Sequence, residues 1–334
     1  MAGAGTTLSA RHESLPLARP FRISRGVKTA AEVVTVAIGR DGKVGRGEGV
    51  PYPRYGESVE SALAAIEAQK GPIEAGASRH DLLDLMPAGA ARNALDCALW
   101  DLEARLTGRS VFATLGLAEP LAPIATALTI GLDTPDAMRD AARELARAPL
   151  VKVKVDSSDP AAQLRAVREA APDPRLIVDP NESWSMKEVE GLQELMIDLR
   201  VDLLEQPLPA GEDRALDGFA SAIPIAADES IHTASDLDNL ASGYGVVNVK
   251  LDKAGGLTGA LQLIDQARER ELGIMIGCMI SSSLSIAPAL ALAADSAFAD
   301  LDGPLWLMED RSDGVSCDRG MLHRPCEGFW GAAN

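Results

Sequence analysis

Positive charge is scarce in this chain. Its 334 residues contain 32 Lys and Arg against 49 Asp and Glu, which gives a net charge of −17 and a pI of about 4.7. Contacts to nucleic-acid phosphates need a basic face, so the composition argues against a nucleic-acid partner. It is typical of a strongly hydrated protein surface.

Cysteine is also scarce, and none of the four cysteines forms a C-x-x-C pair. This usage is typical of reduced thiols, so we expect a cytoplasmic protein. The start of the chain, residues 1–21, contains no uninterrupted apolar core. We therefore expect no signal peptide.

Long apolar runs are limited to one stretch, Gly273–Ala294, which is long enough to raise the question of a membrane helix. Gly, Ser and Pro cluster in its middle. This cluster instead predicts a strand, a turn and a buried helix, and we expect no membrane partner.

What the chain does contain is a repeated unit. From Ile124 onward, short runs rich in Val, Ile and Leu alternate with amphipathic stretches, which indicates a parallel sheet with helices outside it. Three successive runs end in acids at positions 179, 205 and 228, which are 26 and 23 positions apart. This spacing matches the strand-helix unit of a TIM barrel. The eight expected strands are 124–131, 149–156, 175–179, 201–206, 224–228, 246–250, 273–279 and 297–302.

The residues before 118 lack this alternation and predict an α+β domain of their own. A strand at 31–39 leads into a hairpin, and amphipathic helices follow at 57–70 and 91–108. We expect the polar segment 20–30 to be a loop that reaches over a neighbouring site. The predicted divisions are an N-terminal α+β domain (1–117), a barrel (118–310) and a C-terminal tail that packs on the first domain (311–334).

Two lysines occupy the second predicted barrel strand. Side chains alternate along a strand, so Lys152 and Lys154 should point to the same face, inside the barrel. Two buried like charges disfavour each other's protonated form. Each lysine should then be easier to find as a neutral amine that can act as a base.

Three acids end the next strands at the same mouth of the barrel. Asp179, Glu205 and Asp228 are hard oxygen donors without His or Cys nearby in sequence, which favours Mg²⁺ or Mn²⁺ over zinc. Lys250 ends the sixth strand, four strands from the one that carries Lys154, so these two amines should face each other across the barrel. Such a pair could invert a stereocentre. A barrel that binds a metal or an acidic ligand without catalysis is the alternative of another class.

Six ordered motifs, which span nearly the whole chain, resemble the muconate lactonizing subgroup of the enolase superfamily. They are VKVKVD, VDPNESW, LLEQPLP, AADES, NVKLDKAGGLT and ARNALDCALWDLEARLTGRSVFATLGL. The resemblance implies an α/β fold, a modified TIM barrel of (β/α)7β type with an N-terminal α+β capping domain that the C-terminal tail completes. It also implies proton abstraction beside a carboxylate, through a metal-stabilised enediolate.

The resemblance also implies roles for residues in these motifs. Asp179, Glu205 and Asp228 become the metal ligands. Lys154 and Lys250 become the paired bases, and Lys152 an electrostatic helper. Asn181 and Glu229 become groups that orient the ligands.

The eighth predicted strand indicates which kind of substrate the site would bind. Asp300 and Asp302 should share one face at the mouth by alternation, and two acids beyond the three assigned to the metal suit an ammonium group. This D-x-D is similar to that of the dipeptide epimerases, where it holds the free amino terminus. The resemblance therefore implies a dipeptide substrate.

Further matches point to those dipeptide epimerases that act on L-Ala-D/L-Glu. The SRG of the 20–30 segment resembles theirs, which implies that Arg25 pairs with the substrate side-chain carboxylate, with Arg22 as the rival. Thr129, Cys278 and Met279 match substrate-contacting segments of the same enzymes.

The chain departs from the subgroup's pattern at one position, and several alternatives stay open. Lactonizing relatives carry a glutamate after the seventh strand where this chain has Ser281, which argues against lactonizing chemistry. The alternative enzymes are an N-acylamino acid racemase and an o-succinylbenzoate synthase. The sequence does not decide the oligomeric state, and a homo-oligomer is one of the open states.

Overall fold

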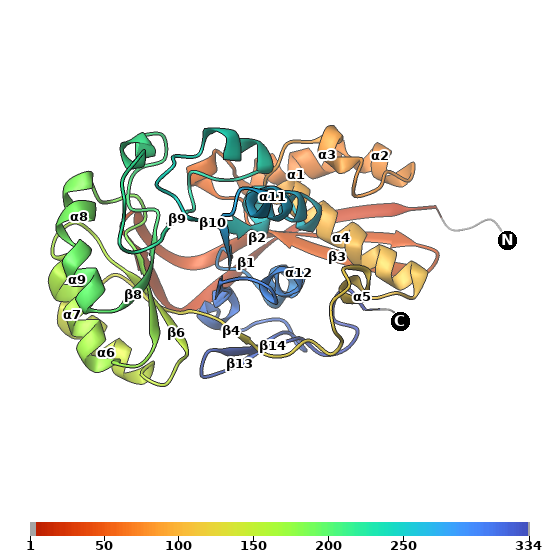
Figure 1. Ribbon diagram of the computed structural model, residues 1–334. Coiled ribbons are helices and arrows are strands. Elements are labelled where there is room, and N and C mark those ends of the chain that lie inside the picture. The colour runs from red at the N-terminus through yellow and green to blue at the C-terminus, as the bar shows by residue number, and fades with distance from the viewer. Residues whose placement is uncertain (1–4, 333–334) are drawn as a thin grey trace.

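The computed structural model describes residues 5–332. Residues 1–4 and 333–334, which include the first positions of the segment expected to lack a signal peptide, lie outside this range. The chain folds into an N-terminal antiparallel sheet with its helices and an eight-stranded parallel barrel (Figure 1). No helix within the described range is long and apolar enough to cross a membrane.

The N-terminal domain packs helices on a three-stranded antiparallel sheet. Its strands are β1 (Thr7–Ile23), β2 (Gly26–Arg40) and β3 (Lys43–Gly49). Its helices are α1 (Val59–Ala68), α2 (Lys70–Glu74), α3 (Leu82–Leu85), α4 (Ala90–Thr107) and α5 (Val111–Thr114), with a 3-10 turn at Pro53–Tyr55. As predicted, the long helix α4 ends at Gly108, whose φ of 68° is left-handed.

The segment 20–30, predicted as a loop, is instead the tip of the β1–β2 hairpin. Phe21 pairs with Lys28, and Ile23 pairs with Gly26. Figure 1 shows the two long strands running from the N-terminal domain to the barrel. The tip reaches the barrel mouth, because the Arg22 carbonyl accepts a hydrogen bond from an N–H of the loop after the first barrel strand.

Three glycines let β3 lie directly against α4. Gly45, Gly47 and Gly49 alternate along the strand and so face the same side. A Cβ at each would lie 2.1–2.2 Å from a carbonyl oxygen of α4. These oxygens belong to alanines spaced one helical turn apart, Ala98, Ala94 and Ala90.

The barrel contains all eight predicted strands, in sheet order from β5 to β12. The strands are β5 (Leu128–Ile130), β6 (Leu150–Lys154), β7 (Arg175–Asp179), β8 (Val201–Glu205), β9 (Ile225–Ala227), β10 (Val246–Lys250), β11 (Gly273–Gly277) and β12 (Phe298–Asp300). The two edge strands meet where the Ala127 N–H donates to the Ala299 carbonyl at 2.8 Å. The α/β barrel fold is therefore confirmed.

The connections between strands are less regular than predicted. The α-helices are α6 (Pro135–Glu144), α7 (Pro160–Ala170), α8 (Met186–Gly191), α9 (Gln193–Asp198), α10 (Leu251–Ala254), α11 (Leu257–Glu269) and α12 (Ser283–Ala293). After β8 and β9 the expected helices are replaced by 3-10 turns at Asp213–Leu216 and Ala234–Asn239, and another such turn, Gly303–Trp306, follows β12. The uncharged run 273–294 is a strand, a turn and a buried helix, as predicted.

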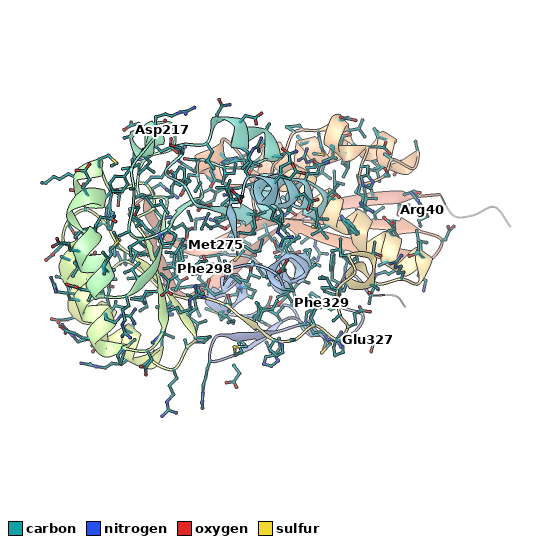
Figure 2. The ribbon with its side chains drawn as sticks, viewed as in Figure 1. Arg40, Asp217, Met275, Phe298, Glu327 and Phe329 are labelled. Atoms are coloured by element: carbon teal, nitrogen blue, oxygen red, sulfur yellow. The ribbon has the colours of Figure 1, made fainter. Side chains whose placement is uncertain are left out.

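An apolar layer closes the lower end of the barrel. Each strand contributes one buried side chain from near its N-terminal end or from its middle, and the eight side chains form one cluster. Figure 2 labels two of them, Met275 and Phe298, which lie close together. The cluster consists of Ala127, Leu150, Ile177, Leu203, Ala226, Val246, Met275 and Phe298. The next inward-facing position on each strand lies above this layer.

The C-terminal tail contacts both parts of the chain. Strands β13 (Ser316–Asp318) and β14 (Met321–His323) form a hairpin that pairs with β4 (Ile124–Ala125), the first half of the predicted 124–131 strand. Further on, the Trp330 indole N–H donates to carbonyl oxygens of Arg46 and Cys97 in the N-terminal domain. Figure 2 labels Phe329, whose ring lies beneath the Arg46 guanidinium.

The contact between β3 and α4 predicts that Gly47→Ala is destabilising. The added methyl group would lie 2.1 Å from a helix carbonyl oxygen, so the strand and helix must separate. We expect the free energy of unfolding to fall by about 2–3 kcal/mol in urea denaturation. Gly71→Ala in α2, where nothing lies within 4 Å, is the matched control and should be neutral or slightly stabilising. Equal stability of the two variants would contradict the close contact.

Candidate active site

The side chains above the apolar layer are nearly all ionisable or polar. Strand alternation places them on the inner face two or four residues after the apolar-layer residue of the same strand, and all are buried. They are Lys152 and Lys154 on β6, Asp179, Glu205, Asp228 just after β9, Asn248 and Lys250 on β10, and Asp300. The predicted gathering of acids and lysines at one end of the barrel is therefore present.

Lys152 lies at the centre of this group. Its Nζ is 2.8 Å from Asp300 Oδ2, 2.9 Å from Glu205 Oε1 and 3.0 Å from Asp179 Oδ2. Lys154 Nζ approaches the same Asp179 oxygen at 2.5 Å. Both lysines thus point inward, as alternation along the strand predicted.

Lys250 lies on the strand four places from β6. Its Nζ is 2.6 Å from Asp228 Oδ2. Gly277 on the next strand gives the side chain room, since a Cβ there would lie 3.0 Å from Lys250 Cε. Lys154 and Lys250 line one cavity of about 640 Å³, part of which is open to solvent.

The predicted ease of deprotonation was wrong for Lys152 in this structure. Burial alone would lower the pKa of Lys152, but Asp179, Asp300 and Glu205 outweigh burial and raise it well above the usual value. Burial likewise lowers the pKa of Lys250, and Asp228 outweighs it in the same way. These carboxylates come from other strands. Their attraction for the ammonium groups is a larger effect on the pKa than the repulsion between lysines.

The three acids predicted as metal ligands are divided between two lysine clusters. Asp179 and Glu205 meet at Lys152, whereas Asp228 binds Lys250 and Lys253. Within residues 5–332, no three His, Cys, Asp or Glu side chains adopt the arrangement of a metal site. The Lys152 ammonium thus lies between Asp179 and Glu205.

The donor set nevertheless fits a hard divalent cation. Burial and the neighbouring Asp179 raise the pKa of Glu205 to about 7, which shows that the acids repel one another. Within the described part of the chain, Glu205 Oε2 accepts no hydrogen bond of good geometry, although Lys152 Nζ lies 2.7 Å away. Buried carboxylate oxygens with spare acceptor capacity are the ligands that Mg²⁺ prefers.

Helix α4 fixes the segment that follows Lys250. Its Arg92 guanidinium donates to the carbonyl oxygens of Ala254 and Gly255, at 2.8 and 3.1 Å. Asn93 donates to Asp252 at 2.8 Å. The N-terminal domain therefore helps to set the position of a lysine on the barrel.

The hairpin tip closes over the mouth through Arg25. Its guanidinium contacts Glu229 Oε1 at 2.7 Å and Glu182 Oε2 at 2.8 Å. Arg22, the rival candidate, does not line the cavity. Glu229, expected to orient a metal ligand, binds Arg25 instead, whereas the Asn181 N–H and amide do bind Asp179, at 2.8 and 3.3 Å.

The residues predicted to contact substrate all line the cavity. Asp300 Oδ2 binds Lys152, whereas its Oδ1 is buried without a hydrogen-bond partner among residues 5–332. Asp302 Oδ2 accepts the Thr129 N–H at 2.8 Å and the Trp306 indole N–H at 3.3 Å, so it also holds β12 against β5. The lining residues of this predicted group are Arg25, Thr129, Lys152, Cys278, Met279, Asp300 and Asp302.

Two buried residues in the site were not assigned from the sequence. Lys253 Nζ donates to the Asp228 carboxylate and carbonyl, both at 2.6 Å, and to the Asn248 carbonyl at 3.0 Å. Asn248 donates its amide to Glu205 Oε1 at 2.9 Å. Alternation marks Asn248, which lies two residues before Lys250, whereas Lys253 lies on a helix and no strand pattern identifies it.

The fold and this buried set of acids and lysines define a member of the enolase superfamily. Residues 5–116 match the N-terminal domain of mandelate racemase and muconate lactonizing enzymes, and residues 137–325 match the enolase C-terminal domain-like family. The chain belongs to this family.

Two curated relatives are similar to this chain over most of its length. The chain is 46% identical to an L-Ala-D/L-Glu epimerase of Escherichia coli K12, over 95% of this chain and 99% of the relative. It is 42% identical to an N-acetyl-D-glutamate racemase of a Pseudoalteromonas species, over 90% of this chain and 96% of the relative.

Solved structures agree with these relatives. An enolase family member from Agrobacterium tumefaciens, described as homologous to dipeptide epimerases and holding sodium and L-Ala-L-Glu, superposes with a TM-score of 0.94 at 46% identity, covering 98% of this chain and 100% of that one. A dipeptide epimerase from Enterococcus faecalis with Mg and L-Leu-L-Tyr superposes with a TM-score of 0.89 at 27% identity, covering 99% of both chains.

The contacts of Lys253 predict that Lys253→Met is destabilising. Methionine keeps the apolar stem but leaves two carbonyl oxygens without this donor and removes a partner of Asp228. We expect the free energy of unfolding, measured by urea denaturation with a chelator present, to fall by about 3 kcal/mol. Lys187→Met at an exposed position of α8 is the control, with an expected change within about 0.5 kcal/mol. A loss for Lys253→Met no larger than that of the control would argue against the role.

Proposed function

We propose that this chain is a Mg²⁺-dependent dipeptide epimerase that interconverts L-Ala-L-Glu and L-Ala-D-Glu by two-base proton transfer. The observation that carries the proposal is the placement of two buried lysines, Lys154 and Lys250, on strands four places apart and along one cavity. The relatives and solved structures described above support the substrate class.

The proton transfer follows from this geometry. The bond between the substrate α-carbon and its hydrogen breaks, the proton passes to the neutral Nζ of one lysine, and the electron pair stays on the substrate. The other lysine, as an ammonium, then donates a proton to the same carbon from the opposite face. The first lysine ends protonated and the second neutral, so the pair is set for the reverse direction.

The other charged residues have supporting roles in this proposal. A Mg²⁺ held by Asp179, Glu205 and Asp228 would neutralise the charge that grows on the substrate carboxylate, and Mn²⁺ fits the same donors. Lys152, within 3.0 Å of two of these acids, adds positive charge at the same end of the cavity.

The substrate ammonium is assigned to Asp300. Asp300 lines the cavity, and its Oδ1 is buried and has no partner among the described residues. A buried unpaired carboxylate oxygen is costly unless a ligand satisfies it. Asp302 lies beside Asp300 and adds a second negative charge. An ammonium group next to these acids would be held by charge-assisted hydrogen bonds.

A second candidate function is the racemisation of an N-acylamino acid, which the 42% identity to an N-acetyl-D-glutamate racemase favours. Such a substrate has the same acidic proton but no ammonium, so it would bring no cationic partner to Asp300 Oδ1. The proposed substrate is a muropeptide fragment, which implies a role in muropeptide recycling. A cytoplasmic location and the domain divisions at residues 117 and 310 stay predictions, and a homo-oligomer stays one of the open states.

Isotope exchange tests the two-base proposal. With L-Ala-L-Glu and Mg²⁺ in D₂O, the chain should incorporate α-deuterium and form the second epimer, and chelation should abolish both. Lys154→Ala and Lys250→Ala should each lose epimerisation by at least about 10³-fold. Each variant should still exchange the α-proton of one epimer, and the two variants should exchange opposite epimers.

Lys187→Ala serves as the surface control for these measurements. Exchange of the same epimer by both lysine variants would mean that the lysines act from one face. A barrel that only binds its ligand would give no exchange at all.

The role of Asp300 separates the two candidate reactions. Asp300→Asn keeps the shape and removes the charge, so kcat/KM for L-Ala-L-Glu should fall by about 10- to 100-fold more than kcat/KM for N-acetyl-glutamate. Steady-state kinetics on both substrates give this ratio, in which any shared effect on Lys152 cancels. Equal losses on the two substrates would remove the assignment of the ammonium to Asp300.

A further inference from the structure

The segment that follows Lys250 is held by the N-terminal domain. Asp252 lies on α10, two residues after Lys250, and its side chain is buried. Its Oδ1 accepts the Val50 N–H and an amide N–H of Asn93, both at 2.8 Å. Val50 follows β3 directly and Asn93 lies on α4, so both donors belong to the N-terminal domain. One barrel carboxylate thus joins two elements of the other domain.

The segment that follows Lys154 is held by the barrel itself. The Trp184 indole N–H donates to the Asp156 carbonyl, two residues after Lys154, at 3.1 Å. The hairpin tip contacts the next loop, at the Asn181 carbonyl. Among residues 5–332, no hydrogen bond joins 155–159 to the N-terminal domain. The two lysines therefore differ in how directly they depend on the packing of the domains.

Asp252 also fixes a part of the N-terminal domain that faces the cavity. Val50 leads into Tyr52 and Tyr55, whose side chains line the cavity together with Lys250. Because the Val50 N–H donates to Asp252, the start of this segment is tied to α10. The placement of Lys250 and the placement of this cavity wall are thus coupled through one carboxylate.

We propose that Asp252 is a positioning residue for Lys250, and that through it the N-terminal domain controls one of the two opposite proton transfers and not the other. This inference rests on the proposed epimerase function, in which each lysine removes the α-proton of one epimer. A base that is displaced by about 1 Å can lose about 100-fold in rate. A shift of α10 would displace Lys250 and leave Lys154 in place, so the loss should fall on one epimer.

Isotope exchange distinguishes positioning from general damage. The initial rate of α-deuterium incorporation in D₂O with Mg²⁺ is measured for L-Ala-L-Glu and for L-Ala-D-Glu separately. The epimer that Lys250→Ala no longer exchanges is the one that Lys250 deprotonates. Asp252→Ala leaves Val50 and Asn93 without their acceptor, so it should slow the exchange of that epimer by about 10- to 100-fold more than the exchange of the other. A purely structural loss would lower both rates alike.

Asp252→Asn is the conservative variant. Its amide oxygen can accept the same two hydrogen bonds. Burial outweighs those hydrogen bonds and raises the pKa of Asp252 to about 7, so the site accommodates an uncharged group. The exchange ratio of Asp252→Asn should therefore stay close to that of the unmodified chain. Asp265→Ala, at an exposed position of α11, is the surface control and should leave both rates unchanged.

Two further variants keep the test independent of one substitution. Asn93→Ala removes one of the two donors to Asp252 and should shift the exchange ratio in the same direction by a smaller factor. Trp184→Phe removes the N–H that holds the Asp156 carbonyl, so it should slow the epimer that Lys154 deprotonates more than the other.

Equal losses on the two epimers for Asp252→Ala would overturn the positioning role and leave the epimerase function standing. The same conclusion would follow if Asp252→Asn lost as much as Asp252→Ala. No exchange of either epimer by the unmodified chain would overturn the epimerase function, and the role of Asp252 with it.

Discussion

The site depends on mutual neutralisation of charges that the barrel keeps out of water. Eight apolar side chains close the lower end, and the layer above them places Lys152 within 3.0 Å of three carboxylates from three other strands. A lone buried charge of this kind would be far too costly, and each group is tolerated because its partners are fixed. The strands that build the barrel therefore also determine which acid meets which lysine.

The N-terminal domain is as much a part of this site as the barrel. Three glycines of β3 let α4 lie close to the sheet, and α4 in turn holds the segment after Lys250 through Arg92. The hairpin on the other side carries Arg25 to the acids of the mouth. A cavity that needs both domains is shielded from water only when they are packed together, and shielding strengthens each charge interaction within it.

The parts that the sequence predicted well are those with a local cause. Eight barrel strands and their inward residues follow from a period of two, and this pattern is written in consecutive residues. β1 was missed because Pro16 and Pro20 interrupt it, and an edge strand tolerates prolines that a central strand would not. The helices expected after β8 and β9 are absent, and the segment after β8 is rich in Pro and Gly.

What the sequence could not supply is the pairing of charges across the barrel. Lys152 and Asp300 are 148 positions apart, so no neighbouring residue indicates that they meet. The hairpin tip is a second example, because the SRG motif identifies Arg25 but does not indicate which residues Arg25 contacts. Only the assembled structure shows that Arg25 neutralises Glu182 and Glu229.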